Sequence, residues 1–292
     1  MRHALEALLV RGLAGCAAAA PRALDRGAAL GDLVRRMGLR RRVAESNLAR
    51  AFPERSEEER RGILAAHYRE VARVAWEYPR MPSLVRGEKG VAEVRGYEHL
   101  EWARSLGRGV ILLTGHYGNF ELLGACLGQR HPTDFLVKPL SNPQVEAMLA
   151  RWRREAGIGS ISIGVGTRRV FQSLRQNRWI AMLADQDARG HGVFVPFFGT
   201  LASTPVGPAQ IALRTGAPIV MGFDRRREDG RHELDILPPL PMPEGTGEDA
   251  VRALTAAHTA VLEEWVRRQP EMWFWLHRRW KTAPPAAARR VA

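Results

Sequence analysis

The chain has 292 residues, which is enough to bury a substantial core, and 45% hydrophobic with 26% charged residues excludes a largely disordered protein. Its formal net charge of +13 favours an anionic partner: nucleic acid, anionic lipid headgroups or an acidic carrier protein. A GC-rich genome would explain the preference for arginine over lysine but not the net charge. The two cysteines, Cys16 and Cys126, do not form a disulfide framework.

The N-terminal segment is apolar but poorly suited to crossing a membrane. Residues 4–20 are interrupted by Glu6 and Arg11, whereas a spanning helix needs roughly 20 mainly apolar residues. Five arginines follow between positions 35 and 42, and an apolar segment next to a basic cluster is typical of interfacial anchoring. We therefore expect residues 1–30 to associate with a membrane surface, followed by one folded domain over 31–282 and a flexible tail over 283–292. A signal peptide, or a helix packed on the domain, are the alternatives.

The remaining pattern predicts alternating helices and strands. Ser56-Glu-Glu-Glu59 has the form of a capping box and predicts a helix over 57–78, which Pro79 ends. Short apolar runs then predict strands at 109–114, 134–138, 160–163, 179–184, 217–223 and 232–237. The segments between them predict helices at 119–129, 143–156, 168–177 and 205–215, with a last helix at 248–268. This order predicts an α/β sandwich with a mixed, mostly parallel sheet flanked by helices.

A histidine and a glutamate follow the first of these strands, in the sequence Gly-His116-Tyr-Gly-Asn-Phe-Glu121. On a regular helix the two side chains would lie about 140° apart. With glycines at 115 and 118, however, His116 can lie in a turn while Glu121 occupies the first helical turn, and the side chains can meet. The carboxylate would then orient the imidazole as a general base. A histidine at a helix cap and a glutamate favourable to the helix dipole are the structural alternative.

Two aspartates, Asp185 and Asp187, close the strand predicted at 179–184. An Asp-x-Asp at a strand end can hold a divalent metal ion and a nucleotide diphosphate, so a metal-dependent glycosyltransferase is an alternative function. A non-enzymatic protein that binds lipid or nucleic acid through its basic charge is another. The sequence lacks Gly-x-Ser-x-Gly and Gly-x4-Gly-Lys-[Ser/Thr], so neither a nucleophile-elbow hydrolase nor a P-loop has support.

Six motifs, in order, resemble the lysophospholipid acyltransferase superfamily, in particular its branch of bacterial lipid A (lauroyl/myristoyl-type) acyltransferases. They are Arg42-x4-Asn47-Leu-x3-Phe52-Pro53, Gly-His116-x4-Glu121, Lys138-Pro-Leu-x-Asn142-Pro143, Leu183-Ala-Asp185-Gln186-Asp187, Val193-Phe-Val-Pro-Phe-Phe-Gly199 and Trp275-Leu-His277-Arg278-Arg279-Trp280-Lys281. They span roughly residues 30–282.

The resemblance implies an O-acyltransferase in which His116 deprotonates a hydroxyl that attacks an acyl thioester, with Glu121 as its orienting partner. It also implies an important arginine within 151–154, where Arg154 is the first choice and Arg153 the second, for the oxyanion or a phosphate. Asn119, Lys138 and Asp187 are further candidates for substrate binding.

The partners that the resemblance implies are acyl carrier protein or acyl-CoA as donor and a glycolipid, such as a lipid A precursor, as acceptor. The expected place is the cytoplasmic face of a bacterial inner membrane, with an anionic surface. We expect a monomer that needs no dissociable cofactor and no metal, and no nucleic-acid partner.

Overall fold

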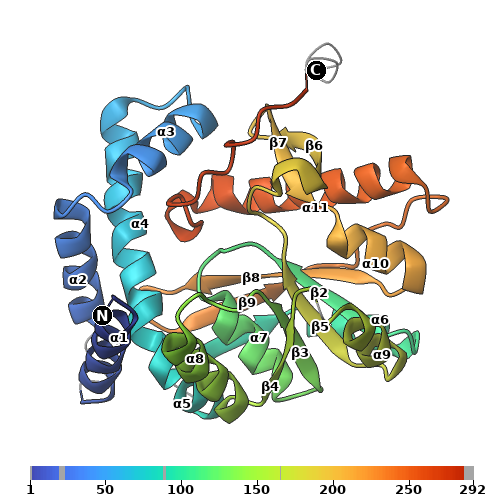
Figure 1. Cartoon of the computed structure of the whole chain (residues 1–292), viewed down its shortest axis with the longest axis horizontal. Coiled ribbons are helices and arrows are strands. Elements are labelled where there is room, and N and C mark those ends of the chain that lie inside the picture. Colours follow the sequence, from blue (N-terminus) through green and yellow to red (C-terminus); the bar gives the residue numbers. More distant parts are fainter. Residues whose placement is uncertain (1, 20–23, 88–89, 165, 286–292) are drawn as a thin grey trace.

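A computed structural model of the chain describes residues 2–19, 24–87, 90–164 and 166–285. Its first part is helical and comprises α1 (Arg2–Ala19), α2 (Leu24–Arg36), α3 (Arg41–Ala51), α4 (Glu57–Glu77) and, after a 3-10 turn at Tyr78–Arg80, α5 (Met81–Arg86). The capping box of α4 is present, because the side chain of each residue, Ser56 and Glu59, accepts a hydrogen bond from the backbone N–H of the other. Figure 1 shows these helices grouped at one side of the molecule.

The described residues then form a seven-stranded sheet in the order β1-β9-β8-β2-β5-β3-β4. Its strands are β1 (Val91–Arg95), β2 (Val110–Thr114), β3 (Thr133–Val137), β4 (Ile158–Ser162), β5 (Trp179–Leu183), β8 (Ile219–Arg226) and β9 (His232–Ile236). Within this sheet, only β8 and β9 pair in antiparallel fashion among the described strands. The predicted mixed, mostly parallel sheet is therefore confirmed.

Helices cover both faces of the sheet, and side chains that alternate along the strands fill two cores. Ile111 and Leu113 face the side of α9 (Thr167–Arg175), α10 (Gly207–Thr215) and α11 (Glu248–Arg268), whereas Val110 and Leu112 face α6 (Tyr97–Ser105) and α7 (Phe120–Gly128). A further cluster joins α5 and α7 to α8 (Pro143–Glu155). Figure 1 shows α11 above the sheet and α7 and α8 below it.

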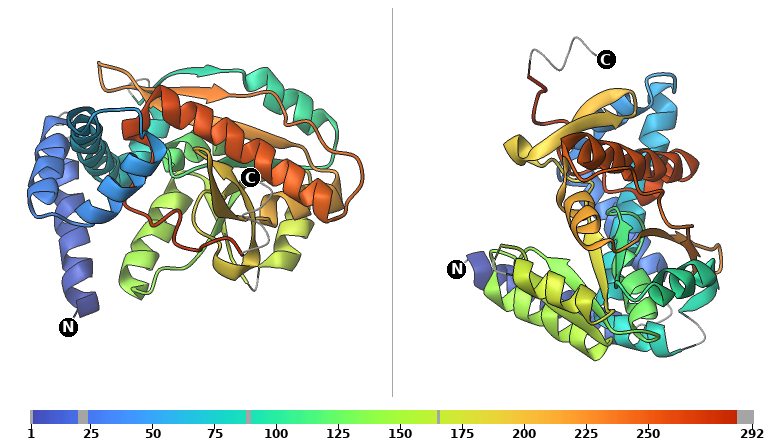
Figure 2. Two further views of the ribbon diagram at one scale, coloured as in Figure 1. Left: turned by 90° about the horizontal axis from the view of Figure 1, so that it is seen from above. Right: turned by 90° about the vertical axis from the view of Figure 1, so that its right-hand side faces the viewer.

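An antiparallel hairpin and an aromatic segment complete the fold. Strands β6 (Gly192–Phe197) and β7 (Thr200–Pro205) form the hairpin, which packs on α11, as the side view in Figure 2 shows. A 3-10 turn at Pro270–Met272 leads into residues 273–282, the C-terminal segment, in which Trp273 and Trp275 are fully buried. Neither this hairpin nor β1 is predicted from the sequence.

No helix within the described residues is both long enough and apolar enough to cross a membrane. The predicted membrane-associating segment corresponds to α1 and the first part of α2, on which Leu8 and Leu9 are each 65% exposed. Its association with a membrane stays a prediction, as do the domain limits at residues 30 and 282. Residues 286–292 of the predicted tail lie outside the described residues.

Candidate active site

The register of two neighbouring strands brings a histidine and an aspartate together. Strand β2 pairs with β5 in parallel, and Thr114 lies opposite Leu183. His116 and Asp185 each follow their strand by two residues, so both stand at the carboxyl edge of the sheet, where α/β proteins collect their ligands. The adjacency of β2 and β5 therefore accounts for this pair.

Asp185 holds the imidazole of His116 in one orientation. Nδ1 of His116 lies 2.7 Å from Oδ1 of Asp185, and the backbone N–H of His116 donates to Oδ2 at 2.7 Å. The indole Nε1 of Trp273 donates to the same Oδ2 at 2.9 Å. The Gln186 amide nitrogen lies 3.3 Å from Nε2 of His116, which leaves that ring nitrogen as the acceptor and Nδ1 as the N–H that donates to Asp185.

Burial of this pair does not prevent the carboxylate from ionising. Burial opposes the charge on Asp185, but the imidazolium charge of His116 and the hydrogen bonds from His116 and Trp273 outweigh it and lower the pKa of Asp185 to about 2. Burial likewise opposes the charge on His116, yet the Asp185 carboxylate raises the pKa of the imidazole above its ordinary value. Asp185 is therefore the charged partner that makes His116 a stronger base.

The turn that carries His116 is fixed from two sides. The C-terminal segment binds it through Phe274, whose N–H donates to the His116 carbonyl at 2.9 Å, while Gly118 donates to the Met272 carbonyl at 2.9 Å. Gly118 has a φ of 53°, and a Cβ there would stand 2.6 Å from the carboxylate of Asp224, so glycine is required. This turn therefore depends on contacts from distant parts of the chain.

Glu121 lies in the first turn of α7, as predicted, but its carboxylate does not hold the imidazole. It forms a two-point ion pair with Arg153, in which Nε of the guanidinium lies 3.1 Å from Oε2. In this structure Asp185, and not Glu121, contacts the imidazole, so an orienting role for Glu121 stays a prediction. Glu121 remains near enough to raise the pKa of His116 further through its charge.

The other predicted residues are distributed differently. Arg153 and Lys138 line the cavity described below, whereas Arg154, the first choice among the arginines, is exposed and does not line it. Asn119 is buried as the N-cap of α7, and its amide donates to Glu77 at 2.9 Å. Asp187 does not line the cavity either. Its carboxylate accepts a hydrogen bond from Thr282 at 2.9 Å.

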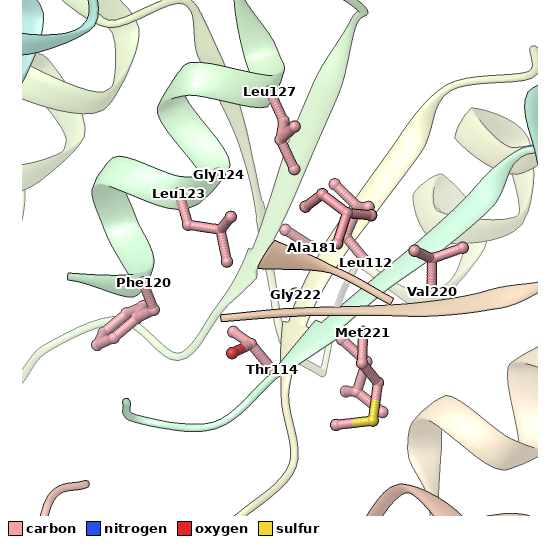
Figure 3. Close-up of a pocket in the computed structure, with 12 residues that line it drawn as sticks. Leu112, Thr114, Phe120, Leu123, Gly124, Leu127, Ala181, Val220, Met221 and Gly222 are labelled. Carbon is pink, nitrogen blue, oxygen red and sulfur yellow. The ribbon is translucent and has the colours of Figure 1, made fainter. Parts of the chain in front are cut away.

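His116 opens into a cavity of about 550 Å³ with mainly apolar walls. Lys138, Arg153 and Glu121 are its charged lining residues, and Phe135, Leu136 and Leu183 are among its apolar ones. A narrow apolar pocket of about 20 Å³ adjoins this cavity, because Thr114, Phe120 and Ala181 line both. In Figure 3 this pocket lies between α7, which contributes Leu123 and Leu127, and the sheet. The site therefore combines a polar end with an apolar interior.

The Asp-x-Asp does not present a free pair of carboxylates. Both oxygens of Asp185 accept hydrogen bonds from His116 or Trp273, and one oxygen of Asp187 accepts from Thr282. In the part of the chain that the structure describes, no group of three His, Cys, Asp or Glu side chains has a geometry suited to a metal ion. This geometry favours His116 as a general base over a metal-dependent glycosyltransferase that uses Asp185 and Asp187.

Comparison with known proteins indicates the class of reaction that this site catalyses. Residues 2–282 match the family described as bacterial lipid A biosynthesis acyltransferase. The chain belongs to that family. It is therefore an O-acyltransferase, and not a glycosyltransferase or a non-enzymatic binding protein. Its family supports an acceptor of the lipid A or glycolipid type.

Several acyltransferases of known name are similar in sequence to this protein along most of its length. The lipid A biosynthesis lauroyltransferase of Escherichia coli is 30% identical over 278 residues, covering 90% of this chain and 87% of the relative. The palmitoleoyltransferase of the same organism is 28% identical over 254 residues, covering 84% and 80%. The phosphatidylinositol mannoside acyltransferase of Mycolicibacterium smegmatis is 28% identical over 240 residues, covering 80% and 77%.

Three residues of the site were not assigned to it from the sequence. The resemblance implied that the segment from Asp185 to Asp187 lines the site, but Asp185 was given a specific role only as a metal ligand, Gln186 was given none, and Trp273 was seen as part of an aromatic tail. Asp185 and Gln186 directly follow a predicted strand, so their position carried a usable signal. Trp273 reaches Asp185 from a distance of 88 positions along the chain, and no local pattern indicates that contact.

Proposed function

We propose that this acyltransferase moves a fatty acyl chain from acyl carrier protein or acyl-CoA to a hydroxyl of a glycolipid at the cytoplasmic face of a membrane. The observation that carries the proposal is the His116 imidazole, held by Asp185 through Nδ1 and directing Nε2 into a cavity with apolar walls. The site thus has a base for the hydroxyl and an apolar space for the chain. No covalent enzyme intermediate is needed.

The reaction follows from this arrangement. Nε2 of His116 takes the proton of the acceptor hydroxyl, and the oxygen attacks the carbonyl carbon of the thioester. The tetrahedral intermediate collapses as the carbon–sulfur bond breaks, and the thiolate that leaves receives the proton from His116. The products are the ester and a free thiol, and Asp185 stabilises the imidazolium between the two proton transfers.

Donors for the developing oxyanion stand close to the base. The Gln186 amide is already within 3.3 Å of Nε2 of His116, and Lys138 and Arg153 line the same cavity. We infer that one of these groups faces the carbonyl oxygen in the transition state, where a positioned donor contributes most. Arg153 is held in place by Glu121, so in this proposal Glu121 acts by positioning that arginine.

The acyl chain occupies the apolar part of the cavity in this proposal. A saturated chain gains about 0.8 kcal/mol for each methylene that leaves water, so an apolar wall supplies donor affinity. The pocket in Figure 3 shares Thr114, Phe120 and Ala181 with the cavity, and its volume of about 20 Å³ has room for little more than a terminal methyl group. In this proposal these shared residues mark where the chain ends and so limit the chain length that fits.

Several surface features support action at a membrane. Leu33, Met37 and Leu39 are more than half exposed at the end of α2 and the turn after it, beside Arg36, Arg41 and Arg42. Apolar side chains next to cations suit an interface of lipid and anionic headgroups. We infer a monotopic association through this region and α1, with the protein acting as a monomer.

The acceptor is a glycolipid hydroxyl in this proposal. The E. coli relatives are named for lipid A biosynthesis and the mycobacterial relative for phosphatidylinositol mannoside acylation, so sugar-bearing lipids are common to both groups. Either class of acceptor fits the same chemistry at His116.

Purified protein and mass spectrometry test the proposal. Wild type is incubated with a glycolipid acceptor and with either acyl-carrier-protein or acyl-CoA thioesters, and the product mass identifies the chain and the acceptor. His116→Ala should lower the rate by at least about 10²-fold. His131→Ala, a change at a histidine that does not line the cavity and contacts the Asn177 carbonyl, is the matched control. A folded His116→Ala protein with full activity would remove the proposal.

A further inference from the structure

A second cavity, of about 320 Å³, lies between α3 and the C-terminal segment. We call it the basic groove, and its polar walls consist of Arg42, Ser46 and Arg50 on one side and Arg278, Trp280 and Lys281 on the other. Positions 42, 46 and 50 are four residues apart and therefore share one face of α3. No acidic residue lines the groove.

The four cations of the groove have no carboxylate partner among the described residues. Two arginines of the interior do have carboxylate partners, Arg153 in Glu121 and Arg226 in Glu77. In the groove the guanidinium of Arg50 instead lies over the ring of Trp280, 5.6 Å from its centroid. All four cations are exposed, and with no carboxylate among them they give the groove a positive potential that favours a negatively charged group.

The two walls are held together in advance. The Asn47 amide donates to the carbonyls of Trp275 at 2.8 Å and His277 at 2.6 Å, and Nη1 of Arg40 donates to the Leu276 carbonyl at 3.1 Å. These bonds join α3 to the C-terminal segment directly beside the groove. A preformed concave site loses less free energy on binding than one that has to assemble around its ligand.

The chemistry of the walls favours a phosphate group. A guanidinium presents a planar fork of N–H donors that matches two phosphate oxygens, and Arg42 and Arg50 line the same groove as a third arginine and a lysine. An acidic protein surface would need a broad and flat basic face, whereas this groove is concave and small. A compact dianion fits these dimensions better.

We propose that the basic groove binds a phosphate group of the acceptor lipid. The inference rests on the proposed function, because it assigns the groove to the substrate whose hydroxyl reacts at His116. The C-terminal segment links the two places: Phe274 binds the His116 carbonyl, and Arg278 and Lys281 of the same segment line the groove. Anchoring the acceptor by its phosphate orients the sugar before the proton transfer.

Binding without turnover tests the assignment. A lipid A precursor that carries its phosphates, and the same lipid after phosphatase treatment, are each placed in phosphatidylcholine vesicles, and binding is measured without any acyl donor. Arg42→Gln/Arg50→Gln should bind the phosphorylated lipid about tenfold more weakly than wild type and the dephosphorylated lipid equally well. Arg168→Gln/Arg175→Gln, which removes two exposed arginines of α9, is the control with the same change in charge and should bind both lipids as wild type does.

Other outcomes would overturn the inference. Equal binding of the phosphorylated lipid by wild type and Arg42→Gln/Arg50→Gln would do so. An equal loss of binding by Arg42→Gln/Arg50→Gln on phosphatidylglycerol vesicles would also do so, because the groove would then be a site for bulk anionic lipid. In a separate acyl-transfer assay, a rise confined to the KM of this variant for acyl carrier protein would instead assign the groove to the donor. Since no donor is present in the binding arm, failure of acyl transfer in a separate assay would reject the proposed function without affecting this result.

Discussion

The His116–Asp185 contact explains why the two residues act together although 69 positions separate them. In the proposed reaction His116 supplies the nitrogen that meets the hydroxyl, and Asp185 fixes the tautomer and carries the compensating charge. Trp273 and the His116 backbone N–H hold Asp185 in turn. Because each of these groups restrains the next, loss of any one alters the base as well as its own contacts.

The pH dependence of acyl transfer follows from the pKa of His116. Asp185 raises that pKa above its ordinary value of about 6.5, despite the opposing effect of burial, and the base acts only when unprotonated. The rate should therefore rise with pH through an apparent pKa above about 6.5. Asp185→Asn removes the charge, so the acid limb should move to lower pH while the rate falls by about 10²-fold or more.

A pH profile of kcat/KM for both proteins checks this prediction. Asp187→Asn is the control, because that carboxylate accepts a hydrogen bond from Thr282 and does not touch His116. An acid limb at the same pH in wild type and Asp185→Asn would contradict the assignment of Asp185.

Ala181 lies where the cavity meets the narrow apolar pocket. Ala181→Phe would close that junction, so the longest acyl donor should lose about tenfold or more in kcat/KM while a donor several carbons shorter keeps its rate. Competition between donors of different length, read by mass spectrometry, gives the ratio directly. A uniform loss at all lengths would show that the substitution acts through folding instead.

A buried ionic cluster joins α4 to β8 and β9 and reaches the active-site turn. Arg226 contacts Glu70 and Glu77 of α4, and His232 lies 2.7 Å from Asp224 through Nδ1 and 3.2 Å from Glu77 through Nε2. The other oxygen of Asp224 accepts the N–H of Asn119 at 2.6 Å, at the start of α7. The elements that flank His116 are therefore fixed by charges inside the protein.

Removal of one cation from this cluster should be costly. Arg226→Met leaves Glu70 and Glu77 buried without their partner, and we expect the free energy of unfolding to fall by about 3–5 kcal/mol. Arg227→Met, at a neighbouring exposed position, should change it by no more than about 1 kcal/mol. Urea denaturation of both variants measures the difference, and equal losses would contradict the role of the cluster.

The same cluster predicts a loss of stability at alkaline pH. Burial opposes the charge on His232, but Asp224 and Glu77 raise its pKa to about 10, against about 6.5 in the unfolded chain. The stabilisation is fully present below about pH 6.5 and declines as the pH rises toward 10. His232→Gln should be less stable at pH 6 and should lose less stability between pH 6 and 10, as urea denaturation at each pH would show.

At the scale of the whole molecule, the apolar side chains exposed near the basic cluster distinguish one side of the protein. Leu33, Met37 and Leu39 lie at the end of α2 and the turn after it, 54%, 76% and 56% exposed, whereas the exposed apolar residues of α6 lie on a different part of the surface. Exposed apolar side chains that lie singly are common on protein surfaces. These three lie beside several arginines, and that combination suits a lipid interface.

Replacing Leu33, Met37 and Leu39 together by serine should weaken binding to vesicles that contain anionic lipid by about tenfold or more, since each side chain loses the free energy of leaving water. Serines at Trp102 and Leu106, which are 55% and 41% exposed on and just after α6, are the control and should leave binding unchanged. Flotation of protein with vesicles reads the outcome. Equal effects of the two sets would remove the proposed membrane-facing side.

Periodicity and caps in the sequence predicted most of the strands of the sheet and the helices between them, but not β1 or the hairpin of β6 and β7. The capping box at Ser56, the strands that precede His116 and Asp185, and the family motifs could all be recognised from neighbouring residues. They predicted the sheet, the acyltransferase class and His116 as the base to test.

Only the tertiary structure decided which charged groups meet. Glu121 is near His116 in sequence, but Arg153 takes its carboxylate, and the partner of the imidazole comes from the adjacent strand β5. Strand order and the return of the C-terminal segment are long-range choices that bury whole faces, and a local pattern of residues does not specify them. For that reason the sequence suggested His116 as a candidate base, and the fold was needed to find its contact with Asp185.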